Sequence, residues 1–171
     1  MHHALVAILL SGLGSAPLPD QGAAADAFDG CAFISAADAE ATMGGKLSRR
    51  PRVVRRTLGT VESYGCNYRG DDFTIEVRVE AGRSRDDLQM YLKALGATVK
   101  QTTASALTPV SGIGDGAWWG PVNPTSGILH VVSGTDVIWV QTYGKSPGAG
   151  SLEKTRAVMD KVFAHYKGVR K

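Results

Sequence analysis

Metal-binding residues are scarce in this sequence of 171 residues. It has two cysteines and four histidines, and two of the histidines stand at positions 2 and 3. No second histidine, cysteine or acidic residue stands at ligand spacing from His130, the one histidine in the central part of the chain. A zinc site needs three or four such ligands. We therefore expect no metal site and no cofactor.

An excess of charge is also small. The chain has 19 Lys and Arg residues against 16 Asp and Glu residues, which gives a formal net charge of +3. Nucleic-acid-binding domains usually show a stronger positive excess, together with aromatic residues on which bases stack. No aromatic residue occurs between Lys46 and Val61, the most basic part of the chain. We therefore expect no nucleic-acid partner.

Long hydrophobic runs are missing as well. The apolar run Ala4–Leu10 is far shorter than the roughly 18 residues that span a bilayer. Small residues and Ala23–Ala25 follow it, as in a secretory signal peptide with an Ala-x-Ala cleavage site. No Lys or Arg precedes the run, so a wrongly chosen start codon or an apolar tail stays open. We predict a signal peptide at residues 1–25 and a single exported domain at 26–171, periplasmic or secreted, with no transmembrane segment.

Export would place the two cysteines in an oxidising compartment, where disulfides form. In an exported protein, an even number of cysteines indicates a disulfide, and here Cys31 can pair with Cys66. Closing a loop of about 35 residues would stabilise the fold by roughly 3–4 kcal/mol in the chain-entropy model. The alternative is a cytosolic protein with two buried free thiols.

Hydrophobic patterning favours an antiparallel sheet with helices. Apolar and polar residues alternate from Phe73 to Glu80, which is typical of a half-buried strand. The predicted helices span 35–43, 84–96 and 151–166, and the predicted strands include 53–58, 61–68, 73–80, 97–103, 127–132 and 136–143. Hairpins dominate, and strands do not alternate with helices. We therefore predict an α+β fold with a largely antiparallel sheet of about five to seven strands packed with two or three helices.

A mixed face of the last hairpin is the candidate ligand face. A turn at residues 134–135 pairs Val132 with Val137 and His130 with Trp139. One face then carries polar groups among apolar side chains. It either packs under a helix or lines a groove for a small molecule, a lipid or an envelope protein. The candidate ligand residues are His130, Trp139, Tyr143, Trp118 and Trp119.

A basic stretch is the second candidate site. Six cations lie within eleven residues, and they are Lys46, Arg49, Arg50, Arg52, Arg55 and Arg56. Such a cluster can dock on anionic lipid or a cell-wall polymer. Alternatively, it is a solvated edge strand and loop that charge keeps soluble.

One segment matches a catalytic motif. Gly144–Gly148 fit the Gly-x-Ser-x-Gly pattern of serine hydrolases, with Ser146 as nucleophile and Asp160 and His165 following in the right order. The oxyanion hole uses the N–H of the residue after the nucleophile, and Pro147 has none. We therefore predict that the protein is not an enzyme, and a small serine hydrolase stays as an alternative.

Three segments carry a resemblance to known proteins. They are Cys31 ahead of Ile34–Glu40 (ISAADAE), Gly65–Tyr68 (GCNY) and Val110–Trp118 (VSGIGDGAW). Their order resembles small exported bacterial proteins and lipoproteins of uncharacterised domain families, some of them similar to the PsbP/Mog1-like sandwich. The resemblance covers about residues 28–166 and implies an envelope or secreted location. The chain departs from it in lacking a lipid-attachment box, so a membrane anchor is not implied. Together these features predict a non-catalytic exported binding or accessory domain.

Overall fold

The computed structural model describes residues 30–59, 61–103 and 106–169, which form one seven-stranded sheet and three helices. All paired strands are antiparallel, in the spatial order β1-β2-β3-β7-β6-β5-β4. The strands are β1 (Arg52–Leu58), β2 (Val61–Arg69), β3 (Phe73–Ala81), β4 (Thr108–Pro109), β5 (Gly116–Asn123), β6 (Ser126–Ser133) and β7 (Asp136–Gly144). The helices are α1 (Ala36–Met43), α2 (Arg85–Thr103) and α3 (Leu152–Val169). The α+β prediction is confirmed, whereas the predicted signal peptide lies outside the described residues.

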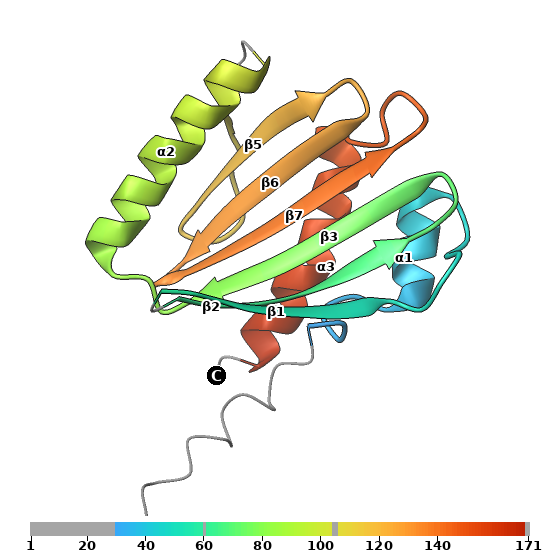
Figure 1. Ribbon diagram of the computed structural model, residues 1–171, viewed down its shortest axis with the longest axis horizontal. Coiled ribbons are helices and arrows are strands. Elements are labelled where there is room, and N and C mark those ends of the chain that lie inside the picture. The colour runs from blue at the N-terminus through green and yellow to red at the C-terminus, as the bar shows by residue number, and fades with distance from the viewer. Residues whose placement is uncertain (1–29, 60, 104–105, 170–171) are drawn as a thin grey trace, which may run out of the picture.

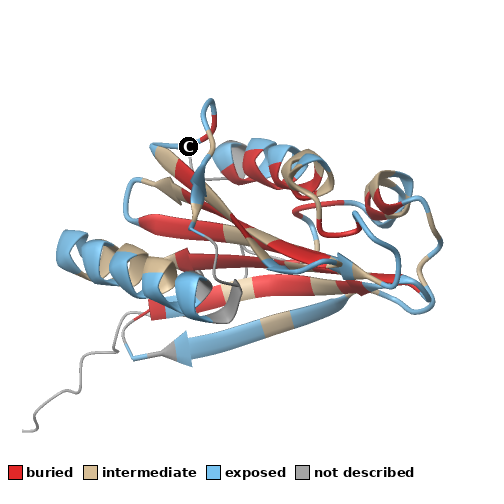
Figure 2. Cartoon of the chain, turned by 90° about the horizontal axis from the view of Figure 1, so that it is seen from above, coloured by how far each residue is buried: buried red, intermediate tan, exposed pale blue. Residues whose placement is uncertain are grey.

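The helices lie on both faces of the sheet (Figure 1). Helix α3 packs across β6 and β7, and α1 lies beside α3. Helix α2 lies on the other side and packs on β5, so it covers one end of that face (Figure 2). We call the two sides of the sheet the α3 face and the α2 face.

The core lies between the sheet and α3. Alternate residues of β3 point to the α3 face because successive side chains of a strand point to opposite sides. Ile75, Val77 and Val79 are buried there in one cluster with Val158 and Met159 of α3. Full burial of each such side chain contributes about 1.5–3 kcal/mol, so this face is the main source of stability.

Helix α2 corrects one prediction. Residues 97–103 were expected to form a strand after a helix that ends at Gly96, but the helix continues to Thr103. Glycines that end helices usually adopt the left-handed conformation. Gly96 lacks the positive φ that Gly44 shows at the end of α1. Gly96 therefore weakens the helix without ending it.

The predicted disulfide is confirmed. Cys31 and Cys66 are bonded, with their Cα atoms 4.9 Å apart, and Cys66 is completely buried on β2. The hydroxyl of Tyr68 lies 3.0 Å from the carbonyl oxygen of Cys31 and 2.7 Å from that of Ile34. The segment before α1 is therefore held against β2 by a covalent bond and by hydrogen bonds.

Candidate functional site

The basic stretch lies along one edge of the sheet. β1 pairs with β2, from Arg52 opposite Asn67 to Leu58 opposite Val61, and no described strand pairs with its other side. In Figure 2, β1 is the almost wholly exposed strand at the margin of the sheet. We call five exposed residues of this edge and of the loop before it the arginine edge, namely Arg49, Arg50, Arg52, Arg55 and Arg56.

Lys46, the sixth cation of the predicted patch, behaves differently. Its ammonium group forms an ion pair with Glu40 at 2.9 Å. The other carboxylate oxygen of Glu40 accepts a hydrogen bond from the backbone N–H of Leu47. This backbone hydrogen bond and the Lys46 ammonium lower the pKa of Glu40. Lys46 therefore closes the connection after α1 and leaves five cations for the candidate site.

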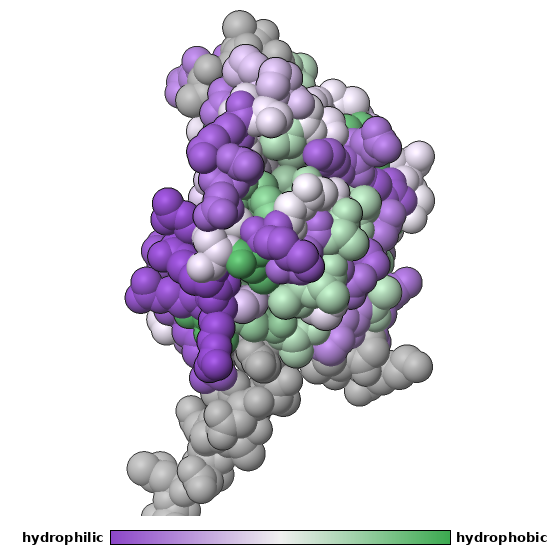
Figure 3. All heavy atoms as spheres, turned by 90° about the vertical axis from the view of Figure 1, so that its right-hand side faces the viewer, coloured by the Kyte–Doolittle hydropathy of each residue, from purple (hydrophilic) through white to green (hydrophobic). Residues whose placement is uncertain are grey.

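The five arginines have no carboxylate partner among the described residues. Six other cations of the described chain do form ion pairs: Lys46, Arg78, Arg83, Lys145, Arg156 and Lys161. No acidic residue occurs from 46 to 58, so the local sequence offers none. Figure 3 views the end of the molecule at which this loop enters β1 and shows hydrophilic residues gathered along one margin. The arginine edge is thus a concentrated positive charge facing solvent.

The arginines of β1 lie on both faces of the sheet. Residues directly opposite each other in an antiparallel pair share a face. Arg55 lies opposite Tyr64, which in turn lies opposite the core residue Val79, so Arg55 is on the α3 face. Arg52 and Arg56 are on the α2 face by the same rule. The positive charge therefore flanks the strand edge from both sides.

The α2 face beside this edge carries a second charged group, which sequence reasoning missed. Burial lowers the pKa of Arg78, and so does the nearby charge of Arg56. The guanidinium of Arg78 forms an ion pair with Glu76 and lies 5.6 Å from the ring centre of Trp139. The indole N–H of Trp139 donates to Glu80 at 3.3 Å. The sequence held a signal for this charged group. The polar residues that alternate with apolar residues from 73 to 80 must lie on one face of their strand.

The residues of the predicted ligand face lie on two different faces of the sheet. The pairings of His130 with Trp139 and of Val132 with Val137 are confirmed. Trp118 lies opposite His130, but Trp119 lies opposite Leu129 and packs against the core on the α3 face. Grouping both tryptophans in one groove was therefore wrong, because neighbouring residues of a strand point to opposite faces.

His130 is enclosed rather than open to a ligand. It is 2% exposed, and its Nδ1 lies 2.7 Å from the hydroxyl of Tyr91 on α2. Burial lowers the pKa of His130 to about 3. Of the expected alternatives, packing under a helix describes this position. Tyr143, 38% exposed near the end of β7, is the open member of the predicted set.

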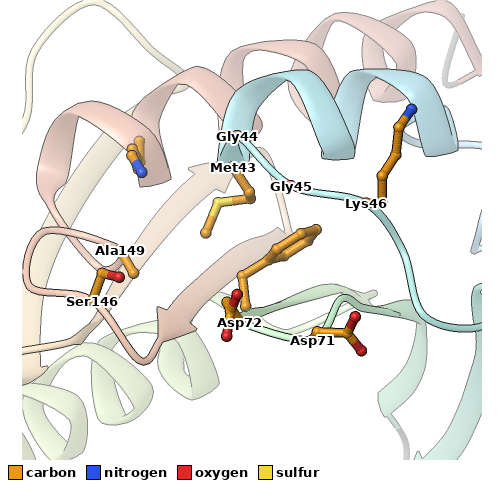
Figure 4. A pocket seen from close by; sticks show the side chains of 10 residues that line it. Met43, Gly44, Gly45, Lys46, Asp71, Asp72, Ser146 and Ala149 are labelled. Atoms are coloured by element: carbon orange, nitrogen blue, oxygen red, sulfur yellow. The ribbon is translucent and has the colours of Figure 1, made fainter.

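The catalytic motif is not assembled. Ser146 lines a cavity of about 260 Å³ between the end of α1, the β2–β3 turn and the loop before α3, near Asp71 and Asp72 (Figure 4). Asp160 instead forms an ion pair with Arg156 at 2.7 Å. His165 packs edge-on against Phe33, with ring centres 5.6 Å apart. Each predicted partner of Ser146 is thus engaged elsewhere.

The described residues contain no group of three or more potential metal ligands. Their helices also include none with the length and apolar character needed to cross a membrane. No family model matches the chain, and searches of curated proteins and of solved structures found no significant match.

Proposed function

We propose that the chain is an exported binding domain that acts without catalysis and docks on an anionic partner through its arginine edge. The observation that carries the proposal is a run of five exposed arginines with no ion-pair partner among the described residues. Unpaired surface cations attract an oppositely charged partner and guide its approach.

Export is supported by the Cys31–Cys66 bridge, because disulfides persist in oxidising compartments and are rare in the cytosol. The absence of catalysis is supported by the separate contacts of Asp160 and His165. The partner fits an anionic component of the cell envelope, which is what an exported basic surface meets.

Binding to an immobilised polyanion tests the proposal. The oxidised protein should bind a heparin resin at low salt and elute as salt is raised, because salt screens exposed charges. The variant Arg52→Gln/Arg55→Gln/Arg56→Gln should bind about tenfold more weakly, since three exposed pairs at about 0.5 kcal/mol each sum to that factor.

The matched control removes three exposed cations from α2. The variant Arg85→Gln/Lys93→Gln/Lys100→Gln changes the net charge equally but leaves the arginine edge intact. It should elute close to the unmodified protein. Equal weakening by both triple variants would mean that net charge, rather than this surface, binds the resin. No retention at low salt would contradict the proposal outright.

A further inference from the structure

We infer that β1 accepts an extended acidic peptide segment as an additional antiparallel strand. This inference rests on the proposed function and specifies the partner of the same surface. The sheet has two edge strands, β1 and β4. One edge is β4, which has two residues and ends in Pro109, a residue with no backbone N–H. The other is β1, which has seven residues.

The backbone of β1 is prepared for such a partner. In an antiparallel strand, alternate residues direct their N–H and C=O groups to opposite sides. One set bonds to β2, and the other points to the side where the described chain has no strand. A peptide that lies along this side can complete the hydrogen-bond ladder, which is the usual mode of strand addition.

The charge on β1 disfavours a second copy of the same chain. An antiparallel pairing of two β1 strands centred on Val54 puts Arg52 of each copy opposite Arg56 of the other. A pairing centred on Arg55 puts that residue opposite itself. Like charges directly opposite each other destabilise a strand pair. The same pattern attracts a strand with acidic side chains.

The two-sided arrangement favours a strand over a flat anionic surface. A bilayer that meets one face of the sheet reaches Arg55, or it reaches Arg52 and Arg56, but not all three from the same side. A strand in the plane of the sheet places side chains on both faces and meets all three. Val53, which is 43% exposed, and the half-buried Val54 lie between them. They fit apolar side chains of the partner.

A complementary partner sequence follows from antiparallel pairing with β1, with Glu placed opposite each Arg and Val opposite each Val. Opposite Arg52–Arg56, read in the antiparallel direction, the complementary segment is Glu-Glu-Val-Val-Glu. The probe is the fluorescent, end-capped peptide Thr-Glu-Glu-Val-Val-Glu-Thr. A second peptide of the same composition, Thr-Val-Glu-Glu-Glu-Val-Thr, has the same charge in the wrong register.

Backbone methylation distinguishes strand addition from simple charge attraction. Two further probes carry N-methyl groups on one or the other alternating set of amides. One set faces β1 and the other faces away, so one probe should bind about tenfold more weakly than the parent peptide and the other should bind alike, because only the first loses donors to β1. Binding is measured by fluorescence anisotropy with the oxidised protein.

The outcomes separate this inference from the proposed function. Strand addition is supported if one methylated probe and the wrong-register peptide bind more weakly than the parent peptide, and if the Arg52/Arg55/Arg56 triple variant binds the parent peptide more weakly than the unmodified protein does. Equal binding of the parent, both methylated probes and the wrong-register peptide would overturn it, although retention on heparin would keep the proposed function. Binding to phosphatidylglycerol vesicles without binding to the peptide would also overturn it. Failure to bind peptide, vesicles and heparin would remove both.

Discussion

His130 makes stability depend on pH. Its folded-state pKa of about 3 lies below the ordinary value of 6.5 because burial disfavours the charged ring. The depressed pKa means that the unfolded chain binds a proton first as pH falls. The stabilising contribution of the neutral His130 ring is therefore fully present above about pH 6.5 and decreases as the pH falls toward 3. We expect a free energy of unfolding about 2 kcal/mol lower at pH 5 than at pH 7.5, measured by urea denaturation.

The control replaces both members of the buried pair. In Tyr91→Phe/His130→Phe, neither the hydroxyl nor the ring nitrogen is left without its partner. The histidine contribution to acid sensitivity should disappear, so the difference between the two pH values should be smaller than in the unmodified protein. An unchanged difference would show that other groups cause the acid sensitivity.

At the scale of elements, α2 offers a direct test of why one prediction was wrong. Gly96 lies inside the helix, and a Cβ built on it meets nothing closer than Leu107 at 4.0 Å. Glycine destabilises a helix interior by about 1 kcal/mol relative to alanine. Gly96→Ala should therefore raise the free energy of unfolding by about 0.5–1 kcal/mol, measured by thermal or urea denaturation.

Gly44→Ala is the opposite control. Gly44 ends α1 with a φ of 76°, which alanine adopts at a cost. This substitution should destabilise the protein although nothing lies within 4 Å of the added Cβ. A loss of stability in Gly96→Ala as well would mean that Gly96 marks a true end of the helix, as the sequence pattern indicated.

The hydrophobic pattern of the sequence located some strands and helices correctly and missed others, each for a physical reason. Alternation located β2, β3 and the last hairpin with its register because one face is apolar. It did not identify the end of α2, since the β-branched residues at 98–99 and 102–103 fit a strand by propensity. Gly96 does not adopt the left-handed conformation that ends a helix, and the chain stays helical to Thr103. Trp118 and Trp119 are neighbours on β5, so the same alternation places them on opposite faces.

At the scale of the whole molecule, the candidate site was predictable in part. The basic stretch was visible as composition, and a solvated edge strand was one of its two expected interpretations. The strand order that puts β1 at the edge required the structure. The pairing of Lys46 with Glu40 was not, because it depends on how the chain turns after α1. The ion pair of Arg78 with Glu76 and its contact with Trp139 likewise required the order of strands, which places β3 beside β7.

The disulfide contributes to the stability of the whole fold and also bears on whether the protein is exported to an oxidising compartment. It closes a loop across 35 positions and joins the segment before α1 to the buried strand β2. Removing it with Cys31→Ala/Cys66→Ala should lower the free energy of unfolding by about 3–4 kcal/mol, because the unfolded chain gains freedom. Reduction should destabilise the unmodified protein and leave the double variant unchanged.

Protein recovered from a bacterial periplasm should start near Asp26 and weigh two hydrogens less than its dithiol form. A full-length chain with two free thiols would contradict export, and equal stability of the oxidised protein and the double variant would show that the hydrogen bonds of Tyr68 suffice to hold the segment.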